Sequence, residues 1–134
     1  MNLAALILTY NEEPNIGRTL EQLRWVPHIV VLDSHSTDRT PEIVGQYENA
    51  VLHQRRFDDH TSQWNYGLRE CGIETEWVLA MDADYWIPDT LADEIQQKLK
   101  QNQNEINAYL LHFYYAILGK RIRSGIYPPV QSLY

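Results

Sequence analysis

Short apolar runs alternate with amphipathic stretches along the first hundred residues. Four of these runs are continuously apolar and short enough to be strands buried on both faces: Leu3 to Leu8, Ile29 to Leu32, Ala50 to Leu52 and Trp77 to Met81. Between them, apolar residues recur at helical spacing. Strands that alternate with helices through short links are typical of βαβ units, so the pattern predicts an α/β fold with a mostly parallel sheet flanked by helices.

Two of the predicted helices have a clear start. Pro14 opens the first, where its missing N–H costs little. Thr40 is expected to be the N-cap of the second, which would run from Pro41 to about Tyr47. Two later helices are predicted from apolar spacing alone, one through Trp64 and Leu68, and one after Pro88 with Leu91, Ile95 and Leu99.

The pattern changes after a polar connector at residues 101–104. The aromatic stretch from Tyr109 to Tyr115 predicts a strand, Gly119 and Lys120 a turn, and Arg121 to Arg123 a short return strand, which together give a C-terminal β-hairpin. An exposed aromatic strand edge tends to associate, so we expect a homo-oligomer that covers it. No linker or internal repeat interrupts the chain, and we expect residues 1–134 to form a single domain.

Charge is distributed unevenly over the 134 residues. The net charge of −7 argues against a nucleic-acid partner, yet no Asp or Glu follows Glu105, and the tail carries only Lys120, Arg121 and Arg123. A basic, aromatic tail suits an anionic acceptor or a membrane face, and a solvated hairpin edge is an equally good interpretation. With one cysteine, no secretory signal and no run of transmembrane length, the sequence predicts a cytoplasmic protein, with peripheral contact to the inner membrane as an open alternative.

Polar residues follow three of the predicted strands, at 9–12, 33–38 and 82–84. The carboxyl ends of parallel strands meet at one edge of the sheet, which is where open α/β sheets bind ligands. Asp82 and Asp84 are hard oxygen ligands that suit Mg²⁺ or Mn²⁺, metals that usually bind together with substrate phosphates. Taken singly, Asp33 or Asp82 could be a turn or cap residue, and it is the convergence of three loops that favours a ligand site.

The neighbouring motifs narrow the class of ligand site. Neither a G-x-G-x-x-G after the first strand nor a Walker-type Gly-Lys-Ser/Thr is present, which argues against a dinucleotide or P-loop fold. Arg55 and Arg56 could meet a diphosphate or base, although a solvated face is the simpler interpretation. The stretch Asn65-Tyr66-Gly67 has two possible interpretations, a structural helix or turn and a contact with the ligand. We expect His35 to be exposed.

Four stretches of the chain form a recognisable set: Leu6 to Glu13, Val31 to Thr40, Trp64 to Gly67 and Met81 to Asp84. With them the chain resembles the N-terminal part of a family 2 glycosyltransferase, which has a Rossmann-like GT-A fold. The stretch from Gly119 to Leu133 resembles the subgroup that extends lipopolysaccharide cores. This resemblance covers nearly the whole chain and implies a GT-A sheet that is incomplete at the C-terminus.

The resemblance implies a role for each motif. Such enzymes transfer a sugar from a nucleoside diphosphate, usually with inversion, to a glycan or lipid-linked acceptor, here with a UDP-type donor expected. Asp33 would accept a hydrogen bond from the base, Asp82 would face the ribose, and Asp84 of the DXD motif would hold the Mg²⁺ or Mn²⁺ that bridges the diphosphate. The implied nucleotide-sugar-binding residues are Thr9, Tyr10, Asn11, Glu12, Asp33, Asn65 and Asp82.

An inverting transfer also needs a general base for the acceptor hydroxyl. The family places an acidic residue well after the metal motif, and no Asp or Glu follows Glu105. The catalytic residue therefore stays unassigned, and we expect donor binding with little transfer by this chain alone. Two alternatives stay open, a non-catalytic nucleotide-sugar-binding or interaction module, and a sugar nucleotidyltransferase, against which the lack of a Gly-rich basic loop counts.

Overall fold

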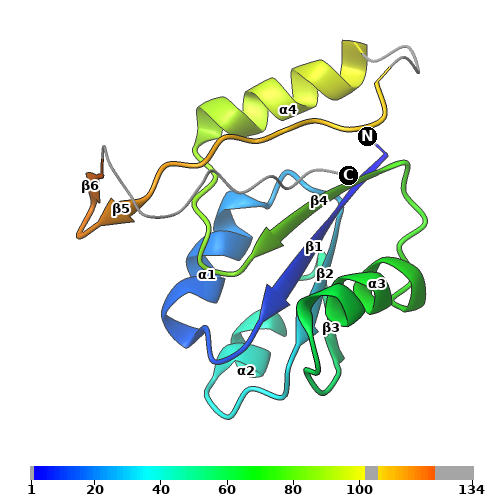
Figure 1. Ribbon diagram of the computed structural model, residues 1–134, viewed down its shortest axis with the longest axis vertical. Helices are drawn as coiled ribbons and strands as arrows, with labels where there is room; N and C mark the ends of the chain where they lie inside the picture. The colour runs from blue at the N-terminus through cyan, green and yellow to red at the C-terminus, as the bar shows by residue number, and fades with distance from the viewer. Residues whose placement is uncertain (1, 102–105, 123–134) are drawn as a thin grey trace.

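The computed structural model describes residues 2–101 and 106–122, and its centre is a four-stranded parallel sheet with the order β3-β2-β1-β4 (Figure 1). The strands are β1 (Leu3–Thr9), β2 (His28–Asp33), β3 (Ala50–Gln54) and β4 (Trp77–Asp82). Each contains one of the four predicted apolar runs. The predicted α/β architecture, a mostly parallel sheet flanked by helices, is confirmed.

The register of the sheet brings the polar strand ends together. β1 lies between β2 and β4, with Thr9 opposite Asp33 on one side and Leu8 opposite Asp82 on the other. Backbone hydrogen bonds continue past the ladder, from Ser34 N–H to the Thr9 carbonyl and from Ala83 N–H to the Leu8 carbonyl. The loops after β1, β2 and β4 therefore meet at one edge, as the sequence predicts.

Helices cover both faces of the sheet. They are α1 (Glu13–Gln22), α2 (Thr40–Val44), α3 (His60–Glu70) and α4 (Asp89–Gln101). Side chains of β1 alternate between two apolar clusters, so that Ile7 packs with residues of α1, α2 and α4, while Leu6 packs with residues of α3. Figure 1 shows the same division, with α3 on the face opposite α1.

The start of α2 differs from the prediction. Thr40 is the first residue of the helix rather than its cap, which is Arg39, and the helix ends at Val44, short of Tyr47. The Thr40 hydroxyl accepts a hydrogen bond from the Glu12 N–H (2.9 Å), while the Asp38 carboxylate accepts from the Thr40 N–H (2.9 Å). The threonine thus joins two loops instead of capping its own helix.

The predicted strand from Tyr109 to Tyr115 is wrong. Residues 106–115 contain no strand, and Figure 1 shows them running extended alongside α4. Alternate side chains still turn inward, where the Tyr109 ring contacts Trp77 (5.4 Å between centroids) and Phe113 contacts Tyr85 (4.7 Å). Aromatic packing replaces the hydrogen-bonded ladder, so the expected homo-oligomer stays a prediction without the strand edge on which it rested.

The predicted C-terminal hairpin is present in a shorter form. Its antiparallel strands are β5 (Ala116–Ile117) and β6 (Lys120–Arg121), joined by a turn at Leu118 and Gly119. Arg123, which the sequence assigns to the return strand, lies outside the described residues.

Candidate functional site

A cavity of about 600 Å³ opens at the edge where the strand ends meet. Its lining includes five of the residues that the sequence singles out: Thr9, Tyr10, Glu12, Asp82 and Asp84. Another part of the wall comes from the segment that precedes α3 and from α3 itself, with Arg56, Phe57, His60 and Gln63. The cavity thus has an acidic wall from β1 and β4 and a more basic wall around α3.

Asn11 and Asn65 are not among the residues that line the cavity. Asn11 adopts a left-handed conformation (φ 52°), and its Oδ1 accepts a hydrogen bond from the Thr37 N–H (2.8 Å). Its own N–H donates to Ser36 Oγ (2.8 Å), so the residue joins the loops after β1 and β2. Asn65 lies exposed on α3. Their predicted contacts with a nucleotide sugar stay predictions.

Asp33 is fully buried at the end of β2 and is occupied by its own chain. Its carboxylate accepts hydrogen bonds from the Ser36 N–H (2.9 Å), the Ser36 hydroxyl (2.5 Å) and Gln54 Nε2 (3.0 Å). A carboxylate offers about four acceptor positions, so these three contacts use most of its capacity. The visible role of Asp33 is to stabilise the turn after β2, and its role toward a base stays a prediction.

Thr9 leaves a polar atom unused in the cavity wall. The residue is only 5% exposed, and its Oγ1 has no hydrogen-bond partner among the described residues. An unsatisfied buried polar group costs about 1–3 kcal/mol, so such groups in native proteins call for an explanation. Thr9 is among the residues that line the cavity, so a bound ligand could supply the partner that this buried hydroxyl lacks.

The two carboxylates at the end of β4 differ in environment. Asp82 is half-buried, and burial raises the pKa of its carboxyl; the neighbouring Asp84 charge adds to the rise, while a hydrogen bond from Tyr85 opposes it. Burial, together with the Asp82 charge, also raises the pKa of the Tyr85 hydroxyl. Asp84 is exposed. A bound divalent cation would relieve the repulsion between the two carboxylates.

The donor set fits one class of metal. Within residues 2–101 and 106–122, no three His, Cys, Asp or Glu side chains gather into a metal cluster. Asp82 and Asp84 therefore offer two hard carboxylates and no closed cage. Mg²⁺ binds in this way, through one or two carboxylates plus water and substrate phosphates.

Polar side chains of α1 hold the acidic loop in place. Thr19 Oγ1 donates to the Ala83 carbonyl (2.6 Å), an Arg18 guanidinium nitrogen donates to the Asp84 carbonyl (3.1 Å), and Gln22 Oε1 accepts from the Ile87 N–H (3.1 Å). The sequence interpretation used only the apolar stripe of α1 and missed these residues. The available signal was a threonine inside the buried stripe, which Thr19 is, with no exposure.

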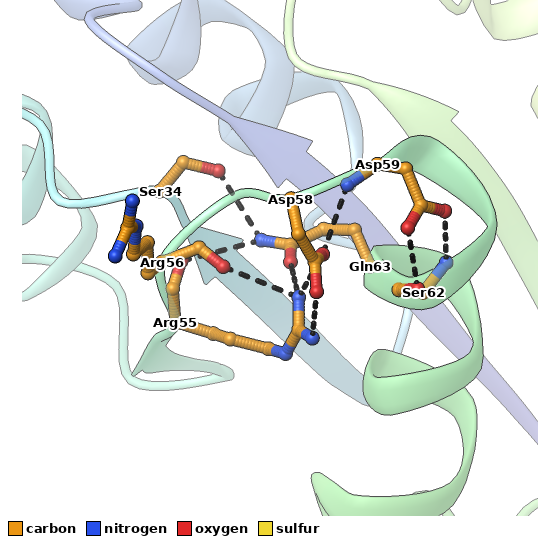
Figure 2. Close-up of polar contacts among 7 residues, drawn as sticks. All are labelled: Ser34, Arg55, Arg56, Asp58, Asp59, Ser62 and Gln63. Carbon is orange, nitrogen blue, oxygen red and sulfur yellow. Dashed lines mark hydrogen bonds and ion pairs between the residues drawn. The ribbon is translucent and has the colours of Figure 1, made fainter.

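A second polar cluster, drawn in Figure 2, holds the segment before α3 and the start of α3. The Arg55 guanidinium donates to both carboxylate oxygens of Asp58 (2.8 Å each) and to Gln63 Oε1 (2.6 Å). Gln63 is fully buried, and its Nε2 reaches Ser34 Oγ (3.2 Å). These contacts tie the start of α3 to the loop after β2.

The cluster changes the interpretation of the arginine pair. Arg55 is not on a solvated face, because its side chain is 24% exposed and bonded to Asp58, whose carboxyl pKa this contact holds far below the usual range. The Arg56 guanidinium, in contrast, has no hydrogen bond or ion pair within the described residues and lines the cavity. The wall is thus fixed by Arg55 and leaves Arg56 available to an anion.

We expect Gln63→Leu to destabilise the fold, because Arg55 and Ser34 would lose a buried partner. The loss of a buried hydrogen-bonding group costs about 1–3 kcal/mol, measurable by urea unfolding. Gln97→Leu on the exposed side of α4 is the matched control and should change stability by less than about 0.5 kcal/mol. Equal stabilities of the two variants would show that the cluster does not hold the wall.

Comparison with known proteins decides the family. The family model described as Glycosyl transferase family 2 matches residues 4–128 of the sequence, which is most of the chain. The chain belongs to glycosyl transferase family 2. Among its relatives in this family, the lipopolysaccharide core biosynthesis glycosyltransferase LpsC of Rhizobium meliloti is 30% identical over 101 residues, which cover 72% of this chain and 37% of LpsC.

The match to a second relative also covers only part of that relative's length. An uncharacterized glycosyltransferase of Rickettsia bellii is 29% identical over 109 residues, 80% of this chain and 36% of that protein. The chain therefore spans well under half the length of these two curated relatives.

Several solved structures share the fold. Staphylococcus aureus TarS 1-349 superimposes with a TM-score of 0.61 at 29% identity, covering 75% of this chain and 33% of TarS. The mannosyltransferase PcManGT from Pyrobaculum calidifontis, in complex with GDP-Man and Mn²⁺, superimposes with a TM-score of 0.60 at 28% identity. The match covers 71% of this chain and 31% of PcManGT. A 4-diphosphocytidyl-2C-methyl-D-erythritol synthase matches in fold alone (TM-score 0.66, 16% identity, 98% of this chain and 73% of that chain). The GT-A fold predicted for this family 2 chain is confirmed.

Proposed function

We propose that this family 2 chain binds a nucleotide-diphospho-sugar together with a divalent cation and forms the donor-binding part of a glycosyltransferase. The observation that carries the proposal is the convergence of Thr9, Glu12, Asp82 and Asp84 in one cavity at the carboxyl ends of β1 and β4. Sugar transfer is the activity of the family. The donor, the metal and their binding residues are the proposed refinement.

In this proposal Asp84 holds the Mg²⁺ or Mn²⁺ and Asp82 faces the ribose. The bound metal would neutralise the charge that builds on the diphosphate as it leaves the sugar. Two further lining residues support the proposal: Thr9, whose Oγ1 has no partner among the described residues, and Arg56, whose guanidinium has none there either. The structural neighbour with GDP-Man and Mn²⁺ supports this class of donor and of metal.

The proposal extends to the biological setting. LpsC supports a role in lipopolysaccharide or other cell-envelope glycan synthesis. A glycan or lipid-linked acceptor and a UDP-type donor are part of the same proposal. Residues 1–134 are proposed to act as one cytoplasmic nucleotide-sugar-binding domain. The proposal assigns acceptor activation to no residue of this chain, since no Asp or Glu follows Glu105.

Calorimetry against a panel of UDP- and GDP-sugars, with Mn²⁺ and with a chelator, tests the proposal. We expect one nucleotide class to bind and the affinity to fall when the metal is removed. A non-catalytic interaction module need not keep this affinity. Failure of every nucleotide sugar to bind in the presence of Mn²⁺ would refute the donor-site assignment.

A further inference from the structure

The β5–β6 hairpin presents an apolar tip that packs against nothing described in the chain. Leu118 is 97% exposed and Ile117 64% exposed, and the nearby Tyr114 is 67% exposed. Figure 1 shows the hairpin at the end of the extended segment, away from the four-stranded sheet. Folding of the described residues therefore gives no reason for two aliphatic side chains at this place.

The conformation of Leu118 strengthens this point. Leu118 and Gly119 both have positive φ values, 50° and 74°, as in the two-residue hairpin turn that favours Asn-Gly or Asp-Gly. A bulky side chain is disfavoured in the left-handed region, and here no contact of the side chain compensates. An unfavourable residue at a fully exposed position points to a role outside the fold.

The cations of the hairpin indicate the charge of its partner. Lys120 and Arg121 form no ion pair within residues 106–122 or with the rest of the described chain, and Arg121 lies over the Tyr114 ring (3.4 Å to the centroid). None of the 18 Asp and Glu residues lies at 106–134. Positive charge and apolar surface are thus combined in one element of a chain whose net charge is −7.

We propose that the β5–β6 hairpin docks this protein on an anionic lipid membrane. Ile117 and Leu118 enter the interface, Tyr114 lies at the level of the headgroups, and Lys120 and Arg121 contact the lipid phosphates. A second copy of the chain fits less well, because a stable protein interface buries about 1,200–2,000 Å² in total and a two-residue tip cannot supply it. A bilayer accepts a small apolar tip without a shaped pocket.

The position of the hairpin connects docking with the cavity. Phe113, which precedes the hairpin, contacts Tyr85, and Tyr85 follows Asp84 directly. Docking would hold the acidic wall of the cavity near the bilayer, where a lipid-linked acceptor would lie. This last step rests on the proposed function, whereas membrane binding itself does not.

The test is sedimentation of the full purified chain with phosphatidylcholine vesicles, with and without phosphatidylglycerol. We expect binding only to vesicles that contain phosphatidylglycerol, weakened by salt. The double variant Lys120→Glu, Arg121→Glu should lose at least about tenfold in affinity, since a juxtamembrane cation contributes measurably at an anionic surface. The matched double variant Lys98→Glu, Lys100→Glu on α4 should bind as the wild type does.

The apolar tip is tested separately. Ile117→Ser, Leu118→Ser should weaken vesicle binding, and Val51→Ser, at a residue 44% exposed on β3, should not. An environment-sensitive dye can be attached to the Leu118→Cys variant, because the native Cys71 is buried and should not react. The emission of this dye should shift to the blue when anionic vesicles are added. All hairpin variants should keep the nucleotide-sugar affinity of the wild type, which separates failure of docking from failure of the donor site.

Three results would overturn the proposal. The first is no binding of the wild type to anionic vesicles, and the second is equal binding by the hairpin and the control variants. The third is a hairpin variant that changes the oligomeric state in sedimentation velocity while vesicle binding stays the same, which would identify a contact between copies.

Discussion

Asp84→Asn should remove most of the Mn²⁺-dependent affinity for a nucleotide sugar. Asp84 is the exposed carboxylate of the cavity, so its charge is accessible to a metal and its loss leaves the fold intact. Two unit charges 4 Å apart near a protein surface interact by about 4 kcal/mol, and water that replaces the carboxylate returns part of this. We expect a loss of about tenfold to a hundredfold, about 1.4–2.8 kcal/mol, in calorimetry with Mn²⁺.

The affinity of the same variant for the nucleotide sugar in the absence of metal should change in the opposite direction. With a chelator present, Asp84→Asn should bind the anionic nucleotide sugar at least as well as the wild type, because a repulsive carboxylate is gone. Asp93→Asn, at an exposed residue of α4 outside the cavity, is the matched control and should behave as the wild type in both conditions. Equal loss of affinity with and without metal would show that Asp84 is not a metal ligand.

Gly67→Ala and Gly17→Ala should change stability in opposite directions, although both lie inside helices. A Cβ at Gly67 would lie 2.7 and 2.8 Å from the two methyl groups of Leu6, which is fully buried. Such overpacking costs about 1–3 kcal/mol, more than the gain of up to about 1 kcal/mol in helix propensity. A Cβ at Gly17 meets Ile43 at an ordinary 3.5 Å, so Gly17→Ala should stabilise the protein by about 0.5–1 kcal/mol.

Urea unfolding measures both changes, and Leu6→Ala identifies their cause. Leu6→Ala alone should cost about 2–5 kcal/mol, because it leaves a cavity between β1 and α3. In the Leu6→Ala background, the penalty for Gly67→Ala should disappear, since the methyl groups that it meets are gone. A Gly67→Ala variant as stable as Gly17→Ala would contradict the close packing of α3 on the sheet.

Residues with a periodic pattern were predictable from the sequence. The apolar runs predicted the positions of β1 to β4. The rule that ligands bind at the carboxyl ends of parallel strands predicted that Thr9, Asp82 and Asp84 lie close together, and all three line one cavity. These predictions succeed because burial of a strand on both faces imposes a continuous apolar run, and parallel strands leave their ends at one edge.

Residues that act through specific polar contacts were not predictable in the same way. Thr19, Arg55 and Gln63 hold the cavity walls through side-chain hydrogen bonds to residues far along the chain or across a loop, and no spacing rule announces such contacts. The motif from Asp33 to Thr40 contains polar residues that mainly bind one another and the loop after β1. Polarity alone does not separate a ligand contact from a loop contact.

The strand prediction for Tyr109 to Tyr115 was wrong for a different reason. Its alternation of inward and outward side chains is real, with Tyr109 and Phe113 packed against Trp77 and Tyr85. A strand additionally needs a hydrogen-bonded neighbour, which depends on tertiary arrangement and not on the local pattern. The pattern therefore predicted an extended conformation correctly and its pairing wrongly.

The central claim is that a divalent metal and a nucleotide sugar meet in the cavity at the carboxyl ends of β1 and β4. The most direct measurement is the line broadening that paramagnetic Mn²⁺ causes in amide resonances of the ¹⁵N-labelled chain, with and without the tightest-binding nucleotide sugar. We predict broadening centred on Ala83 to Tyr85 and on Thr9 to Glu12 that requires the nucleotide sugar. Broadening centred instead on the acidic residues Asp58 and Asp59 or on those of α4, or no broadening at all, would contradict the claim.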